Sequence, residues 1–338
     1  MRTGTRTSAD PRVSVVVPNW NGLRFLPSCL ESVLSQQRVE VELLVIDNGS
    51  RDGSRDFLET KGIEHIALDR NLGFARAVNL GIEGTRAPFV LVLNVDTIVA
   101  ADCLRRLAAE LGTDETVGGV QPRILQAGDQ VPLNGGAPED LGRLGAGEPA
   151  RIYSAGQILL GDGRAFERGT GEIDGPRYRA AGEVFGVSGA ACLLRRELLA
   201  SLDGYDERYF SFYEDVDLNA RARLHGWGFR YVPDAVVLHA GNALWKEGAE
   251  RPSAFNARLV ARNRPATALK TLPPRSLPRV LAAELGSLVR SAGRGTFRAT
   301  LSGKLAVIPW LPDLLAERRG LRREGRPEAL ERWLDRQP

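Results

Sequence analysis

The chain of 338 residues has few cysteines and no long apolar run. Its three cysteines, Cys29, Cys103 and Cys192, lie far apart and form no CxxC pair. This spacing excludes a disulfide framework or a cysteine-based metal site, and it fits a reducing cytoplasm. The longest apolar runs, such as "FVLVL" and "LAVIPWL", fall far short of the ~20 residues that a membrane span needs. Since the leader MRTGTRTSADPR also lacks a signal-peptide core, we expect a cytoplasmic protein.

Two glycine-rich phosphate-binding motifs are missing as well. The first apolar run ends in "VVVPNWNG", without the GxGxxG that a Rossmann dehydrogenase carries at this point. No Walker-type glycine loop with Lys-Ser/Thr is present either, and this also argues against a nucleotidyltransferase. A ligand that bears phosphate would therefore need neutralisation in another way, most simply by a divalent metal.

Charge is distributed unevenly along the chain. The composition, 43% hydrophobic and 26% charged, is typical of a soluble globular protein, and the net charge of +3 argues against dedicated nucleic-acid binding. Residues 246–338 contain 19 Lys+Arg and 9 Asp+Glu, whereas the remainder contains 26 and 33. An acidic body with a basic tail suggests that the tail contacts phosphate or an anionic membrane surface. Solvated helix faces are the alternative explanation.

Strand-like and helix-like segments alternate over the first third of the chain. The strand-like runs are "RVSVVVP", "VELLVIDNGS", "IEHIALD" and "PFVLVLNVD". The intervening segments with helical spacing are "LRFLPSCLESVLSQ", "SRDFLETKG", "GFARAVNLGIEGT" and "AADCLRRLAAELG". Apolar strands separated by such helices predict the α/β class, with a mainly parallel, Rossmann-like sheet flanked by helices on both faces. Ligands of such sheets bind beyond the carboxyl ends of the strands.

The regular pattern stops between about residues 125 and 182, which are rich in Gly, Pro and charge. We expect this segment to be a functional loop and not a neutral insertion. Regular structure resumes with "GEVFGVSGAACLLRRELLASL", followed by "FYEDVDLNARARLHG" and a last strand, "WGFRYVPDAVVLHAG". We therefore expect one main domain over residues 1–245, with a flexible leader at 1–11. A basic helical C-terminal region would occupy 246–338.

Polar side chains end several of the expected strands. Asp47 is followed by Asn48 and Ser50, and a carboxylate there can accept hydrogen bonds from a ribose or a base N–H. The alternative is that "DNGS" only makes a turn. Asn94 and Asp96 end the fourth strand, where a carboxylate is well placed as a hard ligand for Mg²⁺ or Mn²⁺. The alternative for Asp96 is an N-cap of the next helix.

His239 ends the last expected strand. An isolated histidine is usually structural, but Asp96 already offers a carboxylate at another strand end. An imidazole joined to a carboxylate suits Mn²⁺ better than Mg²⁺. His65 and His225 have no such context, and we expect both to be structural.

Three carboxylates, Glu214, Asp215 and Asp217, fall within four positions at the start of an expected helix. Acidic side chains in a first turn stabilise a helix through its dipole, and this accounts for Asp217. The approach to this helix is also crowded by aromatic residues. They are Tyr205, Tyr209, Phe210, Phe212 and Tyr213. An apolar wall beside a carboxylate raises its pKa and makes it a better base.

Taken together, these pieces resemble glycosyltransferase family 2, the inverting GT-A-fold enzymes that use nucleotide sugars. The matching segments include "VSVVVPNWNG", "ELLVIDNGSRDGS", "NLGFARAVNLGI", "VLVLNVDT", the block from "FGVSGAACLL" to "VVLHAGN", and "RNRPATALK". They cover roughly residues 12–270 in the family's order. The "LNVD" variant with its "GYDERYF…EDVDL" block is most similar to bacterial rhamnosyltransferases of cell-wall and surface polysaccharide synthesis.

The resemblance implies a role for each matching position. The nucleotide base and ribose would be held by Pro18, Asn19, Asn21, Asp47, Asn48 and Ser50. The donor pocket would also be lined by Asn71, Gly73, Arg76 and Asn79. Asn94 replaces the first Asp of the family's DxD metal motif, so that Asp96 would hold the metal, and His239 matches the late metal-associated histidine. Asp215 would be the general base, with Glu214 as its neighbour and the second candidate.

The implied reaction is a metal-dependent transfer, with Mn²⁺ or Mg²⁺, that inverts the anomeric carbon. It would move rhamnose from dTDP-rhamnose to a glycan or to an acceptor linked to polyprenyl diphosphate. The loop region at 125–182 would shape the acceptor site or close over the donor. Another donor sugar, such as galactofuranose, GlcNAc or mannose, is the alternative, and an inactive GT-A scaffold is a more distant one. The basic C-terminal helices would lie on the inner face of the cytoplasmic membrane, or pack on the core or on a second subunit.

Overall fold

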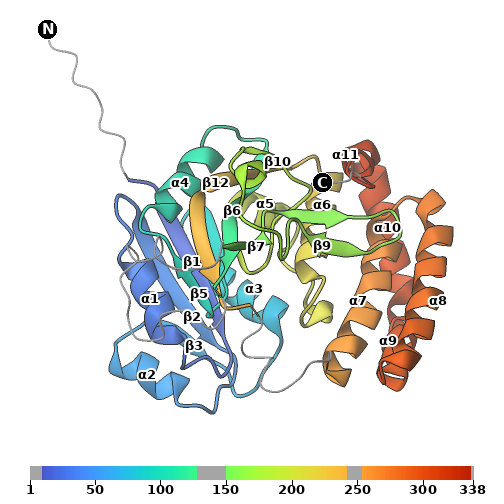
Figure 1. Ribbon diagram of the computed structural model, residues 1–338, viewed down its shortest axis with the longest axis horizontal. Helices are drawn as coiled ribbons and strands as arrows, with labels where there is room; N and C mark the ends of the chain where they lie inside the picture. The colour runs from blue at the N-terminus through green and yellow to red at the C-terminus, as the bar shows by residue number, and fades with distance from the viewer. Residues whose placement is uncertain (1–9, 128–149, 242–252, 336–338) are drawn as a thin grey trace, which may run out of the picture.

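A mixed β-sheet covered by helices organises the protein (Figure 1). The computed structural model describes residues 10–127, 150–241 and 253–335. Within these ranges ten strands join the main sheet, whose central path runs β10-β12-β6-β11-β4-β1-β2-β3. The predicted leader at 1–11 and part of the predicted loop region, 128–149, lie almost wholly outside the described residues.

The N-terminal half of the sheet confirms the predicted alternation. Its strands are β1 (Arg12–Asn19), β2 (Glu40–Asp47), β3 (His65–Ala67) and β4 (Phe89–Leu93). They pair in parallel, because a helix carries the chain back between successive strands. The helices are α1 (Leu26–Leu34), α2 (Ser54–Thr60), α3 (Phe74–Gly84) and α4 (Cys103–Leu111). All four carboxyl ends therefore point to one edge, where a ligand site is expected.

The second half of the sheet is mixed. β11 (Ala191–Arg195) runs antiparallel between β4 and β6 (Val117–Gln126), whereas β12 (Gly228–His239) runs parallel to β6. A short strand, β5 (Thr97–Val99), pairs antiparallel with the end of β12, with Thr97 opposite His239. This register brings the segment after β4 beside the end of the last long strand.

The segment predicted to be an irregular loop contains regular structure in its described part. β7 (Arg151–Ser154) extends the main sheet beside β6. β8 (Gln157–Leu159) and β9 (Ala165–Glu167) form a separate hairpin. β10 (Gly182–Glu183) pairs with β12. The prediction of irregular structure was therefore wrong for residues 150–182. Pairing with partners far along the chain overrides the weak local strand signal of this glycine-rich sequence.

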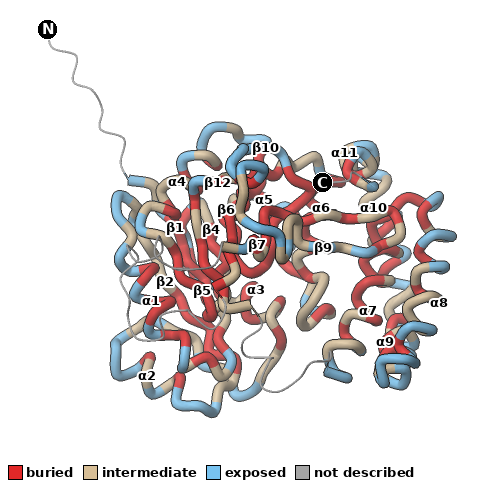
Figure 2. The backbone as a smooth tube through the Cα atoms, in the orientation of Figure 1, coloured by how far each residue is buried: buried red, intermediate tan, exposed pale blue. Residues whose placement is uncertain are grey.

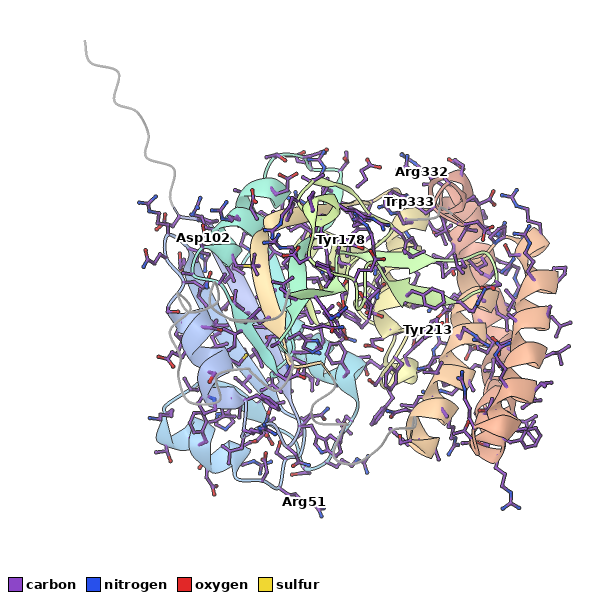
Figure 3. All side chains as sticks on the ribbon, in the orientation of Figure 1. Arg51, Asp102, Tyr178, Tyr213, Arg332 and Trp333 are labelled. Atoms are coloured by element: carbon purple, nitrogen blue, oxygen red, sulfur yellow. The ribbon has the colours of Figure 1, made fainter. Side chains whose placement is uncertain are left out.

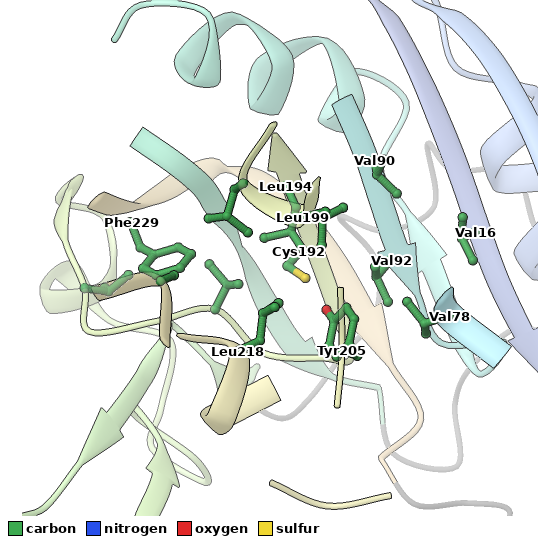
Figure 4. Packing of buried hydrophobic residues seen from close by; sticks show 14 of the residues in the cluster. Val16, Val78, Val90, Val92, Cys192, Leu194, Leu199, Tyr205, Leu218 and Phe229 are labelled. Atoms are coloured by element: carbon green, nitrogen blue, oxygen red, sulfur yellow. The ribbon is translucent and has the colours of Figure 1, made fainter. Parts of the chain in front are cut away.

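Apolar side chains fill both faces of the sheet. On one face, Val16, Val90 and Cys192 from the strands pack against Val78 of α3 and Leu218 of α6 (Glu214–Leu224), as Figure 4 shows. The short helix α5 (Arg196–Ser201) contributes to the same cluster. A second cluster on the opposite face contains α1 and α4. The two clusters hold the strands in place, and the strands in turn support the loops at their ends.

Helices form a layer beside the sheet at the C-terminal end of the chain (Figure 1). They are α7 (Ala254–Thr271), α8 (Leu277–Gly293), α9 (Phe297–Leu305), α10 (Leu311–Glu324) and α11 (Pro327–Glu331). Single 3-10 turns occur at η3 (Pro176–Tyr178), η4 (Glu207–Tyr209), η6 (Pro274–Ser276) and η7 (Ile308–Trp310). The helical prediction for this region is confirmed over the described residues 253–335. None of the described helices has the length and apolar character that a bilayer crossing requires.

A buried ammonium group joins the helical layer to the sheet domain. Lys270 of α7 is 2% exposed, and its Nζ lies 2.7 Å from Asp206 and 3.0 Å from Asp217 of α6. Glu317 of α10 lies 3.3 Å from the same nitrogen. Since a buried charge is tolerated only with such partners, the layer is fixed against the start of α6.

Candidate active site

A cavity of about 370 Å³ lies at the carboxyl ends of β1 and β4. Residues of three origins line it: the strand-end loops, the β8–β9 hairpin and the start of α6. From the sites predicted in the sequence it collects Pro18, Asn19, Asn48, Asn71, Asn94, Asp96, Glu214, Asp215 and His239. The structure therefore brings together most of the residues that the sequence analysis singled out.

The loop after β1 is held by amide and hydroxyl side chains. Asn19 donates from Nδ2 to Asp47 Oδ2 at 3.0 Å and to Ser50 Oγ at 3.2 Å, and the Asn21 N–H donates to Ser50 Oγ at 2.9 Å. Asp47 is fully buried beneath this loop and is not part of the cavity lining. Asn19 Oδ1 is buried without a hydrogen-bond partner among the described residues. A buried carbonyl oxygen of this kind can accept an N–H from a ligand.

A second amide network joins β2 to the start of α3. Asn48 donates from Nδ2 to Asn71 Oδ1 at 3.1 Å and to the Gly73 carbonyl at 3.0 Å. Gly73 has φ +93°, and a Cβ there would lie 2.7 Å from the carbonyl oxygen of Phe210. Only glycine allows this approach. The network therefore fixes the Phe210 loop beside the cavity.

Arg76 and Asn79 lie elsewhere. Their side chains line a second cavity on the other side of α3. Arg76 pairs with Glu207 at 2.8 Å, and Asn79 bonds the backbone of Tyr205 at 2.8 and 2.9 Å. The expected donor pocket would have contained both side chains. Here they instead connect α3 to the segment around η4, so direct contact with a donor in the first cavity has no support from this geometry.

Asp96 and His239 meet at the edge of the first cavity. Asp96 Oδ1 lies 3.0 Å from His239 Nε2, and both side chains are almost fully buried. Asn94 Nδ2 lies 3.4 Å from the same imidazole nitrogen, and the Tyr153 ring contacts the imidazole edge at 4.2 Å between centroids. His239 Nδ1 has no hydrogen-bond partner among the described residues.

This pair fits the predicted divalent metal in its chemistry. A carboxylate oxygen and an imidazole nitrogen converge at one point on the cavity wall. In the described residues no group of three or more His, Cys, Asp or Glu side chains could enclose an ion. A metal held here would take its remaining ligands from diphosphate oxygens and water, as Mg²⁺ and Mn²⁺ do in phosphate-binding sites. The alternative that Asp96 is an N-cap has no support, since its side chain bonds His239 instead.

Glu214 and Asp215 differ in their hydrogen-bond partners. Asp215 Oδ2 accepts hydrogen bonds from Gln157 Nε2 at 2.7 Å and from the Gly189 N–H at 2.9 Å. Burial raises the pKa of the Asp215 carboxyl, and these donors oppose that rise. Glu214 Oε2 is buried without a partner among the described residues. Burial and the charge of Asp215 raise the pKa of Glu214 well above its ordinary value. Of the two carboxyls, Asp215 is therefore the one whose charged form is stabilised by hydrogen-bond donors.

Glu167 of β9 is a third carboxyl in the cavity, and the sequence analysis did not identify it. Its Oε2 accepts from Ser154 Oγ at 2.5 Å, and its Oε1 accepts from Gln157 Nε2 at 3.1 Å. Burial, followed by the charge of Asp215, raises the pKa of Glu167 to about 7. Gln157 thus bridges Glu167 and Asp215, so that one amide sets the geometry of both carboxyls.

Replacing Glu167 with glutamine is expected to stabilise the protein by an amount that grows as pH rises from about 4.5 to about 7 and is complete above that range. The carboxyl is harder to ionise in the folded chain, so the wild-type protein loses stability as pH rises from about 4.5 to about 7. Glutamine removes that cost, and the free energy of unfolding should increase by about 1–3 kcal/mol at pH 8. Urea unfolding at pH 5 and pH 8 measures the difference. An equal gain at both values would contradict the shifted pKa.

An aromatic turn leads into α6. Phe210, Phe212 and Tyr213 have φ of +65°, +67° and +68°, a region that bulky residues rarely adopt. Tyr213, labelled in Figure 3, lies between the hairpin and the helical layer, where its hydroxyl accepts the Ala165 N–H at 3.2 Å. Because α6 begins at Glu214, this turn sets where both carboxyls point.

Asn263 of α7 holds this turn. Its Nδ2 lies 2.9 Å from the carbonyl oxygens of Tyr209 and Ser211 and 2.7 Å from that of Phe212. The side chain is fully buried. Asn263 belongs to a helix outside the sheet domain, and its hydrogen bonds stabilise the strained backbone of the turn.

Replacing Asn263 with alanine is expected to lower the free energy of unfolding by about 1–3 kcal/mol, because the carbonyls of Tyr209, Ser211 and Phe212 all lose this amide donor. The aromatic turn should also become the first site of limited proteolysis. The Asn256→Ala variant, at the start of the same helix, is the matched control. If both variants unfold at the same urea concentration, Asn263 does not hold the turn.

Asp217 lies in the first turn of α6, as predicted, but outside the cavity. Its side chain makes ion pairs with Arg221 at 2.7 Å and with Lys270 at 3.0 Å. Tyr209 donates its hydroxyl to the same carboxylate at 3.1 Å. Asp217 therefore joins α6 to α7, in addition to any effect on the helix dipole.

Comparison with known sequences gives a consistent picture. Residues 14–202 match the sequence model of the family described as glycosyl transferase family 2. The N-acetylglucosaminyl-diphospho-decaprenol L-rhamnosyltransferase of Mycobacterium tuberculosis is 29% identical over 230 residues, which cover 64% of this chain and 70% of that protein. A PGL/p-HBAD biosynthesis glycosyltransferase of Mycobacterium bovis is 32% identical over 130 residues, which cover 36% and 48%. Two further relatives are matched over only 13% and 35% of their own length.

A solved structure supports the fold. The crystal structure of GalNAc-T7 with UDP, GalNAc and Mn²⁺ superposes with a TM-score of 0.52 at 16% sequence identity, covering 81% of this chain and 54% of that one. At this identity the likeness concerns the fold alone. It agrees with the predicted GT-A class, a mainly parallel sheet flanked by helices.

Proposed function

Because the chain belongs to glycosyltransferase family 2, we propose that it transfers a sugar from a nucleotide donor to an acceptor hydroxyl, with inversion at the anomeric carbon. One observation carries this proposal. The Asp215 carboxylate is held by Gln157 and Gly189 in a cavity that Asp96 and His239 also line. The proposed base and the proposed diphosphate-binding groups thus line the same cavity. A single displacement requires this, because the acceptor hydroxyl and the leaving diphosphate must both be close to the anomeric carbon.

Asp215 is the general base of the proposed reaction. The acceptor oxygen bonds to the anomeric carbon as the bond from that carbon to the diphosphate oxygen breaks. The hydroxyl proton passes to Asp215, and the nucleoside diphosphate leaves. Burial raises the pKa of Asp215 and brings it closer to that of a useful base at neutral pH. Gly189 and Gln157 hold Oδ2, so the carboxylate keeps a fixed orientation toward the cavity.

Asp96 and His239 would hold the divalent metal. Their oxygen and nitrogen donors suit Mn²⁺, and two protein ligands leave positions for the donor diphosphate. When bound, the metal supplies a Lewis acid that takes up charge on the leaving diphosphate. Asp96 and His239 would thereby place the diphosphate in the cavity that Asp215 also lines.

The nucleotide end of the donor would occupy the strand-end loops. Asn19 offers the buried acceptor Oδ1, and Pro18, Asn48 and Asn71 line the adjacent wall. Asn21, Asp47 and Ser50 hold the first loop, and Gly73 lets the Phe210 loop approach. In this proposal Asp47 positions Asn19 and does not itself contact the ribose.

The proposed donor is dTDP-rhamnose, and the proposed acceptor is a sugar linked to polyprenyl diphosphate. The support is the Mycobacterium tuberculosis relative, which is named as an L-rhamnosyltransferase acting on a decaprenol-linked sugar. The hairpin residues Gln157, Phe166 and Glu167 would then shape the acceptor side.

A donor panel tests the proposal. Purified protein with Mn²⁺ is incubated with nucleotide sugars that carry rhamnose, galactofuranose, GlcNAc or mannose, and release of the nucleoside diphosphate is measured. The highest turnover is expected with dTDP-rhamnose. A preference for another donor would change the sugar but keep the reaction. If no donor is bound or turned over, the protein is an inactive scaffold and the proposal fails.

A further inference from the structure

Helix α8 exposes a row of apolar side chains although it is a surface helix. Leu281, Leu285 and Val289 follow one another at intervals of four residues, and they are 62%, 58% and 75% exposed. Glu284, on the packed side of the helix, is buried and pairs with Arg264 of α7 and Lys304 of α9. A helix on the surface of a soluble protein normally turns its apolar side inward. The exposed side of α8 is therefore better suited to contact with an apolar partner than with water.

Helix α9 repeats this pattern beside α8. Phe297, Leu301 and Leu305 again recur every four residues, and they are 41%, 36% and 55% exposed. Both helices pack against α7 and against each other, so their exposed sides point away from α7, at the outer edge of the helical layer in Figures 1 and 2. We call these six side chains, three from each helix, the α8–α9 face. Such an extended apolar surface is typical of an interaction site.

The exposed charges carried by α8, by α9 and by the segment between them are of one sign. Residues 272–305 contain six basic residues and one acidic residue, the buried Glu284. Arg290, Arg294 and Arg298, at the connection between α8 and α9, are exposed, and none forms an ion pair with a described residue. An apolar face bordered by unpaired guanidinium groups is complementary to a partner that has an apolar interior beneath an anionic surface layer.

A second copy of the chain is the competing occupant. In a two-fold dimer each patch meets the same patch of its partner. Glu284 is the only carboxylate within residues 272–305, and it is buried and paired, so neither patch offers a partner for the exposed arginines of the other. An anionic lipid bilayer instead supplies both the hydrocarbon for the leucines and the phosphates for the arginines.

We propose that the α8–α9 face docks on an anionic lipid bilayer, with Leu281, Leu285 and Val289 inserted and the neighbouring arginines among the phosphates. This inference rests on the proposed function in one respect, because docking would bring the active-site cavity to an acceptor anchored in the same bilayer. Binding to lipid, however, follows from the face itself and needs no sugar transfer.

Vesicle sedimentation of the full chain tests the proposal. One set of vesicles contains phosphatidylcholine alone, and the other contains phosphatidylcholine mixed with phosphatidylglycerol. The wild-type protein should sediment with the anionic vesicles and much less with the neutral ones, and added salt should weaken binding. The triple variant Leu281→Gln, Leu285→Gln, Val289→Thr should lose at least about tenfold in partitioning. Leu34→Gln on α1, where Leu34 is 57% exposed, is the matched control and should bind as the wild type does.

A second triple variant, Arg290→Gln, Arg294→Gln, Arg298→Gln, isolates the charge contribution. Each arginine near an anionic surface accounts for about a fivefold change in partitioning, so binding to anionic vesicles should fall by about a hundredfold. Arg24→Gln, Arg38→Gln, Lys61→Gln removes the same charge from exposed positions that flank α1 and α2, and should leave binding unchanged.

Donor hydrolysis without vesicles separates the two proposals. Both α8–α9 variants should hydrolyse the donor as fast as the wild type, since no altered residue lines the cavity. Vesicle binding by a protein that turns over no donor would leave the docking inference standing and remove the proposed function. Docking is overturned if the wild type fails to bind anionic vesicles, or if the apolar variant binds them equally well. It is also overturned if the wild type is a dimer that this variant converts to a monomer.

Discussion

Replacing Asp215 with asparagine is expected to lower the rate of sugar transfer by at least about a hundredfold, the usual contribution of a general base. Asparagine has the same shape and can still accept from Gln157 and the Gly189 N–H, so the cavity should keep its form. The amide cannot take the hydroxyl proton. Donor affinity should therefore stay nearly unchanged, as isothermal titration with a nucleotide sugar would measure.

The pH dependence of the same variant sharpens this test. Because burial raises the pKa of Asp215, the acid limb of kcat/KM in the wild type should lie above the ordinary aspartate value of 3.8. That limb should be absent in the residual activity of Asp215→Asn. Asp203→Asn, an exposed aspartate outside the cavity, is the matched control. A variant that loses donor affinity but retains turnover would count against Asp215 as the base, and Glu214→Gln would then be tested in its place.

Removing divalent metal is expected to have a comparable effect. Loss of a Lewis acid at the leaving diphosphate costs several kcal/mol of transition-state stabilisation, so a chelator should lower turnover by at least about a hundredfold. Mn²⁺ should restore it. Asp96→Ala should prevent this rescue at Mn²⁺ concentrations that saturate the wild type, because only the imidazole of His239 would remain of the pair.

Mn²⁺ binding can be followed directly by electron paramagnetic resonance in the presence of a nucleoside diphosphate. The wild type should bind the ion, whereas Asp96→Ala and His239→Ala should bind it more weakly. Asp102→Asn, at a partly exposed aspartate six residues along the chain, is the control. Full turnover in chelator by protein free of metal would refute the assignment of both ligands.

The parallel half of the sheet could be predicted from the sequence because each of its strands carries its own signal. β1, β2 and β4 are apolar runs that end in turn residues, and helices of regular spacing separate them. No local sequence pattern predicts the antiparallel insertion of β11 or the pairing of β5 with β12. Both depend on contacts between segments about a hundred residues or more apart. Local periodicity carries no information on such partners.

The metal pair shows what strand-end reasoning can achieve. His239 was proposed because Asp96 already ends another strand, in a sheet whose strand ends meet. The structure brings them within 3.0 Å across 143 positions of sequence, through the register of β5 and β12. Arg76 and Asn79, which were expected from the family resemblance alone, show a limit of matching residues to a motif. They lie on a helix that adjoins the cavity, and sequence position alone does not reveal which of its sides faces inward.

Glu167, Gln157 and Asn263 could not be identified in advance for a different reason. Glu167 and Gln157 come from a glycine-rich segment that also contains other carboxylates and amides, and nothing in the sequence distinguishes these two from the others. Only the pairing of β8 with β9 brings them together in the cavity. Asn263 acts through three backbone carbonyls of a turn some fifty residues earlier. Roles that consist of holding another group in position depend on tertiary contacts, so residue type alone does not reveal them.

The anomeric configuration of the product tests the central claim most directly. The product formed from a nucleotide sugar of known configuration can be examined by proton NMR before it equilibrates. A single displacement in which Asp215 deprotonates the acceptor predicts the configuration opposite to that of the donor. Retention of the donor configuration would contradict the account, because it would require a route other than one direct displacement at the anomeric carbon.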